Sequence, residues 1–120
     1  MMQLRLGQLI KKLEECDPEQ GVIFDFCRLA PSSLHSYRGY YTDLAISWTQ
    51  DYRPKIKDFL KRLRDVVGFT FEGYKGGEFT MNEATRVWVA NYGESTDTAV
   101  VDVRDLGWAV MIITEPQERR

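Results

Sequence analysis

The chain opens with apolar residues at the helical spacing i, i+3, i+4 and i+7: Leu6, Leu9, Ile10 and Leu13. This spacing is that of one face of an amphipathic helix. Asp17-Pro18 follows, and the residue before a proline is pushed out of the helical region. The pattern therefore predicts a first helix that ends before this dipeptide.

A second helical pattern follows Pro54, because proline is well suited to the first position of a helix. Its apolar face consists of Ile56, Phe59, Leu60, Leu63, Val66 and Val67. Gly68 can take the left-handed conformation that commonly ends a helix. We therefore expect a second helix between Pro54 and Gly68.

Segments with the alternation and the β-branched or aromatic content of strands lie between and after these helices. They are residues 22–27, 40–48, 69–74, 87–92, 99–103 and 108–114. We expect the second of these strands to run antiparallel to the first, and the last two to form a hairpin around Arg104-Asp105-Leu106-Gly107.

Two connecting segments carry more specific predictions. Residues 28–36 are expected to form a loop with Pro31-Ser32-Ser33 as its turn. Thr80-Met81-Asn82-Glu83 has the form of a capping box, so a helical turn is expected to start at Thr80.

These elements predict a single α+β domain over residues 1–120: a mainly antiparallel sheet of about five or six strands, with two principal helices on one face. The charged tail at residues 116–120 is expected to fray. The expected core residues are Leu9, Leu13, Phe24, Phe26, Leu60, Leu63, Val87, Val89 and Val110.

Composition limits the partners. The formal net charge of -2 argues against a general DNA- or RNA-coating role, which usually needs a basic surface. Cys16 and Cys27 make no disulfide framework. No apolar run approaches the roughly 18 residues of a membrane span, and the N-terminus has no signal-peptide pattern. The sequence therefore predicts a cytoplasmic protein with no membrane partner.

Two stretches have a composition unlike that of a core element: Ser36-Tyr37-Arg38-Gly39-Tyr40-Tyr41 and Gly73-Tyr74-Lys75-Gly76-Gly77-Glu78-Phe79-Thr80-Met81. Each places a cation among aromatic residues and glycines. Such residues can pair with phosphate, stack on a ring and let the backbone approach a ligand closely. They favour a pocket for a small anionic, ring-bearing molecule such as a nucleotide. The alternative is structural: strand packing for the first motif, and a bulge or wide bend for the second.

The predicted ligand-binding residues are Tyr37, Arg38, Tyr40, Tyr74, Lys75, Gly76, Gly77, Thr80 and Met81. In this prediction Arg38 and Lys75 contact a phosphate or a comparable anion, and the tyrosines flank a base or ring. The amides of the two glycines reach the same anion, as in an anion-binding nest. Thr80 and Met81 close the rim, because a helix N-terminus favours negative charge.

Other chemistry is weakly represented. A single histidine and two separated cysteines do not supply the four ligands of a zinc site. His35 with Ser33, Ser36 or Cys27 is the only combination available for nucleophilic catalysis, and a loop histidine beside serines is more often a polar surface residue. The carboxylates lie on different predicted elements. We therefore expect a binding protein that is not an enzyme and that uses no metal or cofactor.

The two motifs, with the N-terminal Leu6-Gly7-Gln8-Leu9-Ile10 helix that ends in Asp17-Pro18, resemble a family of small proteins carried by bacteriophages and prophages. The likeness covers most of the chain, residues 4 to 93. It implies a role against host defences in the host cell cytoplasm and carries over no catalytic residues. One possibility is a sponge that sequesters a cyclic or ADP-ribose-type nucleotide signal. The other is an anti-CRISPR-like protein–protein inhibitor of a host defence complex, with Arg38, Lys75 and the aromatic residues as interface hot spots. The glycine-rich cationic motifs favour the sponge.

Aromatic residues make up 12% of the chain and include Trp48, Trp88 and Trp108 on predicted strands. They leave more apolar surface than one small sheet face needs, and tryptophan and tyrosine favour interfaces. We therefore expect self-association, in the form of a two-fold dimer.

Overall fold

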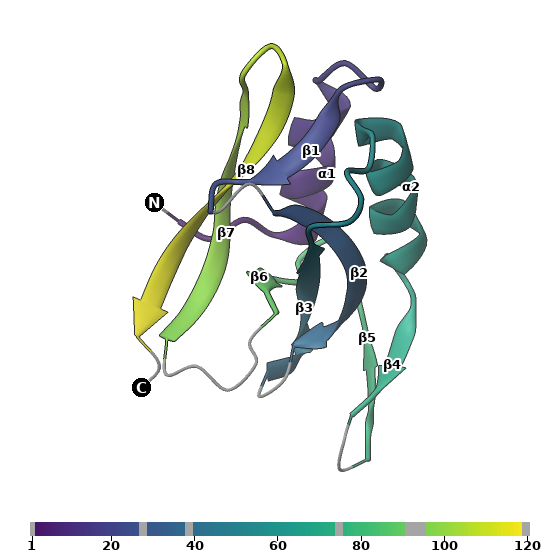
Figure 1. Ribbon diagram of the computed structural model, residues 1–120. Helices are drawn as coiled ribbons and strands as arrows, with labels where there is room; N and C mark the ends of the chain where they lie inside the picture. Colours follow the sequence, from purple (N-terminus) through teal and green to yellow (C-terminus); the bar gives the residue numbers. More distant parts are fainter. Residues whose placement is uncertain (1, 27–28, 38–39, 74–75, 91–95, 119–120) are drawn as a thin grey trace.

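The computed structural model describes residues 2–26, 29–37, 40–73, 76–90 and 96–118 (Figure 1). For Tyr40, Thr96 and Glu118 only the backbone is described. The elements in chain order are α1 (Leu6–Glu14), β1 (Gly21–Phe24), β2 (Ala30–Tyr37), β3 (Tyr40–Thr49), α2 (Ile56–Val66), β4 (Thr70–Glu72), β5 (Glu78–Thr80), β6 (Val87–Val89), β7 (Thr96–Asp105) and β8 (Ala109–Glu118).

Six strands form the main sheet in the order β1-β8-β7-β6-β3-β2, and β4 and β5 form a separate two-stranded ribbon. The pairs β2–β3, β6–β7 and β7–β8 are antiparallel. The pairs β1–β8 and β3–β6 are parallel. The predicted α+β class is confirmed, and the main sheet is mixed but mainly antiparallel.

The main core lies between the helices and one face of the main sheet (Figure 1). Successive strand residues point to opposite faces. Leu44 and Ile46 therefore pack with both helices, while Ala45 belongs to a second cluster on the other face. Of the predicted core residues only Phe26 is half-buried, and it stacks on Phe24 with ring centroids 4.9 Å apart.

The prediction of a loop at residues 28–36 is wrong, because most of that segment is strand β2. β2 is an end strand of the main sheet, and an edge strand tolerates proline because one row of its amides needs no ladder partner. Pro31 therefore sits opposite Trp48 of β3, and the register shifts between Pro31 and Leu34.

The expected pairing of the first two predicted strands is also wrong. β3 pairs with β2 and β6, whereas β1 lies at the opposite end of the sheet order. The segment before α2 occupies the other side of β1. There the Val22 amide donates to the Pro54 carbonyl at 2.9 Å, and the Ile56 amide donates to the Gln20 carbonyl at 2.8 Å.

The C-terminal segment, which the sequence predicted to fray from residue 116, is part of strand β8 through Glu118. β8 pairs with β7 through Glu118, with Thr98 opposite Pro116 and Asp97 opposite Gln117. β1 pairs only with residues 109–112 of β8, so in the described part of the chain Pro116 lies on a free edge, where the missing amide costs no ladder bond. Residues 119–120 lie outside the described residues.

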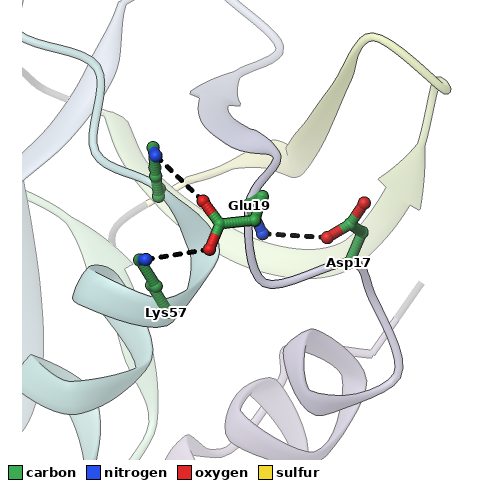
Figure 2. Close-up of polar contacts among 4 residues, drawn as sticks. Asp17, Glu19 and Lys57 are labelled. Carbon is green, nitrogen blue, oxygen red and sulfur yellow. Dashed lines mark hydrogen bonds and ion pairs between the residues drawn. The ribbon is translucent and has the colours of Figure 1, made fainter.

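The loop between α1 and β1 is tied to the start of α2 by charged groups. The two carboxylate oxygens of Glu19 lie 2.9 Å from Lys55 Nζ and 2.8 Å from Lys57 Nζ (Figure 2). The Glu19 amide donates to Asp17 Oδ1 at 2.9 Å. The hydrogen bonds from Lys57 and Lys55 lower the pKa of Glu19 to about 2.

Candidate functional site

The first motif ends strand β2 with a buried tyrosine. Tyr37 is fully buried, and its ring lies nearly parallel to the indole of Trp88 on β6, with centroids 5.0 Å apart. Its hydroxyl donates a hydrogen bond to the buried carboxylate of Asp97 on β7. The Tyr37 ring is therefore covered by protein and is not open to a ligand.

Further polar groups occupy the same sheet face, opposite the helices. Trp88 Nε1 donates to Asp43 Oδ2 at 2.8 Å, and the Ser47 hydroxyl lies 3.5 Å from His35 Nε2. Burial raises the pKa of Asp43, while the Trp88 hydrogen bond and the charge of Arg86 oppose that shift. Burial lowers the pKa of His35, so its imidazole is neutral at pH 7. On this face, polar and aromatic side chains form a layer in which they contact one another.

The sequence pattern indicates only part of this layer. Asp43 and Ser47 alternate with Leu44 and Ile46, and such alternation indicates a strand with one polar face. Asp97 lies outside the segments predicted as strands, and only the register of β7 brings it to Tyr37.

The second motif forms the β4–β5 hairpin, which projects from the rest of the molecule (Figure 1). The Gly73 amide donates to the Gly77 carbonyl at 2.9 Å, and the Gly76 amide donates to the Gly73 carbonyl at 3.0 Å. Gly76 and Gly77 have φ angles of 94° and 89°, which other residues rarely adopt. A Cβ on Gly73 would lie 2.8 Å from the Gly76 carbonyl oxygen. These glycines therefore shape the bend, and the Gly76 amide donates within it.

The prediction of a helical turn at Thr80 and Met81 is wrong. Thr80 ends β5, where its hydroxyl oxygen lies 2.7 Å from that of Thr70 on β4. The threonine hydroxyl that a helix cap requires is therefore used across the hairpin. Met81 is fully buried in the main core, and Asn82 then forms a short turn in which its side chain accepts the amide two residues on.

The two motifs meet at one aromatic contact. Tyr41 near the start of β3 and Phe79 in β5 stack with ring centroids 5.5 Å apart and an angle of 27° between the planes. Phe79 in turn packs against the main core. This contact joins β3, which follows Arg38 in the sequence, to β5, which follows Gly76 and Gly77.

Other predicted site residues are kept apart. Tyr37 belongs to the cluster on the helix-free face, whereas Met81 belongs to the core under the helices. These two side chains lie on opposite sides of the main sheet and do not line one cavity. Arg38, Tyr74 and Lys75 lie outside the described residues, and the side chain of Tyr40 does too.

Comparisons of the chain with protein-family models, with curated proteins and with solved structures found no match. Within the described ranges, no group of three or more His, Cys, Asp or Glu side chains converges as a metal site. Nor does any helix in that part of the chain have the length and apolar character needed to cross a membrane. The geometry around the two motifs is therefore the basis of the functional proposal.

Proposed function

We propose that the protein is a non-catalytic, phage-encoded binding protein that sequesters a small nucleotide signal of cyclic or ADP-ribose type. It acts in the host cytoplasm against antiviral defence. The observation that carries the proposal is the stacking of Tyr41 on Phe79, with ring centroids 5.5 Å apart. In the sequence, Tyr41 lies three residues after Arg38 and Phe79 lies four residues after Lys75. The contact therefore supports one shared site for the two motif cations.

In this proposal Arg38 and Lys75 hold the phosphate groups through charge-assisted hydrogen bonds. Tyr40 and Tyr74 flank the base or ring, since an aromatic ring can stack while its hydroxyl makes a hydrogen bond. The chain has a net charge of -2, so an anionic ligand depends on local positive charge rather than on the overall field. Tyr37 has a supporting role, because its contacts with Trp88 and Asp97 fix the end of β2.

The test is incubation with a panel of cyclic nucleotides and ADP-ribose derivatives, removal of free ligand, release by heat, and chromatography of what is released. We expect one nucleotide to be recovered intact. Recovery of a converted product would make the protein an enzyme, and recovery of nothing from the whole panel would contradict the sponge.

Variants of the two cations assign the site. Arg38→Ala and Lys75→Ala should each weaken binding by about 2 kcal/mol, the scale of a charge-assisted hydrogen bond lost from a buried site. Their free energies of unfolding should change less. Arg104→Ala is the matched control, since Arg104 is exposed on β7 outside both motifs. If Arg38→Ala and Lys75→Ala bind normally but unfold more easily, the motifs are structural.

A protein–protein inhibitor of a host defence complex is the second candidate, and one observation favours it. Phe69 is 53% exposed and meets Phe71 edge-on with centroids 4.8 Å apart. Both rings line a groove of about 360 Å³ that also includes Arg62 and Asp65. An exposed phenylalanine beside an arginine suits an interface, because aromatic residues and arginine are enriched there. Loss of defence inhibition in Phe69→Ala, with nucleotide binding absent from the wild type, would favour this candidate.

We also propose that the protein forms a two-fold dimer. Trp48 is 39% exposed and Trp108 is 58% exposed, whereas Trp88 is buried under Tyr37. Light scattering at micromolar concentration should give twice the chain mass of 14.0 kDa. A particle of 14.0 kDa would contradict the dimer without bearing on the nucleotide site.

A further inference from the structure

A second cationic feature lies where the N-terminal segment meets the chain before β6. The Leu6 amide donates to the Thr85 carbonyl at 2.7 Å, and this antiparallel pairing sets Arg5 directly opposite Arg86 in an isolated bridge. Like charges directly opposite each other across paired strands are destabilising. Two exposed arginines therefore occupy paired backbone positions, where their like charges lower the stability of the pairing.

A cavity of about 390 Å³ opens beside this arginine pair. The rest of its lining consists of apolar and amide side chains: Met2, Gln3, Leu4, Gln8 and Gln117. No carboxylate is among these described lining residues. The volume lies within the range of pockets that hold small molecules.

The positive charge at this cavity is compensated only in part, by Asp43 and Glu83, neither of which lines the cavity. None of the ion pairs among the described residues includes Arg5 or Arg86, and the Arg5 guanidinium donates to the neutral Ala84 carbonyl at 2.7 Å. Helix α1 begins beside Arg5 with no acidic residue in its first turn, so the positive end of the helix adds to the same field. Asp43 interacts electrostatically with both arginines and offsets part of their charge, and its carboxylate also accepts the Trp88 indole hydrogen bond.

The amide side chains provide both donors and acceptors to an occupant. Gln8 Oε1 accepts the Arg5 amide at 2.8 Å, which leaves the Gln8 amino group as a donor. Gln3 Nε2 donates to the Val87 carbonyl at 2.8 Å, which leaves its oxygen as an acceptor. Such groups can bind the polar substituents of an organic ligand whose charged end meets the arginines.

We propose that this cavity binds a small phosphate monoester, with Arg5 and Arg86 on the phosphate oxygens and the glutamine amides on the organic part. A doubly charged anion between the two guanidinium groups replaces their repulsion with two charge-assisted contacts. The site is separate from the two motifs and does not depend on the nucleotide sponge.

The test compares thermal unfolding in sodium chloride, sodium phosphate and sodium glycerol phosphate at matched ionic strength. A ligand that binds only the native state raises the unfolding temperature. We expect both phosphates to raise it above the chloride value for the wild type, and glycerol phosphate to act at lower concentration. Equal unfolding temperatures in all three salts would overturn the proposal.

Arg86→Gln should stabilise the protein in the absence of phosphate and weaken its binding of phosphate. Without phosphate and at low salt it should unfold at a higher temperature than the wild type, because the like-charge pair is gone. Its apparent dissociation constant for glycerol phosphate should rise roughly tenfold or more, the scale of one charge-assisted hydrogen bond. Arg104→Gln is the matched control and should keep the wild-type response. A full phosphate response in Arg86→Gln, or its equal loss in Arg104→Gln, would overturn the site.

Arg38→Ala separates this cavity from the motif site. If the phosphate response persists in Arg38→Ala, the anion binds at the arginine pair, whatever becomes of the nucleotide sponge. If Arg38→Ala abolishes the response while Arg86→Gln keeps it, the anion binds at the motifs and this inference is wrong.

Discussion

The two faces of the main sheet are buried by different means. The face under α1 and α2 is packed with aliphatic and aromatic side chains from both helices and most strands. The opposite face buries Tyr37 and Trp88 together with Asp97 and holds Asp43 half-buried, linked by hydrogen bonds. An apolar core requires mainly matching volume, whereas a buried polar group without its partner costs about 1–3 kcal/mol. The helix-free face therefore fixes the chemical identity of its residues more strictly than the helix-covered face does.

The largest effect should come from the helix-covered face. Leu63 is fully buried on α2, so Leu63→Ala removes buried methyl groups and leaves a cavity, at a cost of about 2–5 kcal/mol. Urea unfolding measures the loss. Lys61→Ala on the exposed side of the same helix is the control and should change the free energy of unfolding little, because its ion pair with Asp65 is exposed.

Tyr37→Phe tests the other face. It keeps the ring on Trp88 and removes only the hydroxyl that donates to Asp97. The free energy of unfolding should fall by about 1–3 kcal/mol, the cost of leaving a buried acceptor short of a donor. Tyr52→Phe is the control, since Tyr52 is 50% exposed. Equal effects of the two variants would mean that the helix-free face tolerates loss of its polar groups.

A smaller effect should appear as a pH dependence of the helix-free face. Burial lowers the pKa of His35 below its ordinary 6.5, so below pH 6.5 the unfolded chain takes up a proton before the folded protein does. Stability should therefore fall as the pH drops from 6.5 toward the lowered pKa. The raised pKa of Asp43 acts in the opposite direction, because acidification toward pH 3.8 protonates the folded state first.

His35→Gln separates these two contributions. Between pH 7.5 and pH 5 the free energy of unfolding should fall less in His35→Gln than in the wild type, since the variant lacks the imidazole that penalises acidification. His35 is the single histidine of the chain, so no other imidazole contributes. A variant whose stability falls with pH as steeply as the wild type would show that His35 is not the group responsible.

The smallest effect on stability should come from an exposed charge. Glu19 pairs with Lys55 and Lys57 at the start of α2 (Figure 2), and its pKa of about 2 lies below the ordinary 4.5. Its contribution is present above pH 4.5 and is lost as the pH falls toward 2. An NMR titration should find this low pKa and show it rising with added salt, because exposed ion pairs are screened. A pKa of 4.5 at low salt would show that Glu19 does not pair with these lysines in solution.

Local patterns predicted much of the fold. The spacing of Leu6, Leu9 and Leu13 fixed α1, and the apolar face that includes Leu60 and Leu63 fixed α2. The pairing of the strands was not accessible in this way. Pro31 indicated a turn, yet β2 is a strand, because a proline is acceptable at the sheet edge and only the full strand order makes β2 an edge.

The same distinction between local pattern and long-range pairing applies to the candidate site. The sequence by itself offered a bend at Gly76 and Gly77 as the structural alternative to an anion site, because tolerance of positive φ is a property of a single residue. It also identified Tyr37, Thr80 and Met81 as candidate ligand-binding residues from their residue types and the motifs around them.

Only the tertiary structure decided where those side chains lie. Tyr37 is buried against Trp88 and Asp97, and Met81 is in the core on the other side of the main sheet. The pairing of β4 with β5 gave the Thr80 hydroxyl a partner in Thr70 and removed it from capping. A residue type sets what a group can do, but burial and partners come from segments distant in the chain, and their arrangement follows from how the strands assemble.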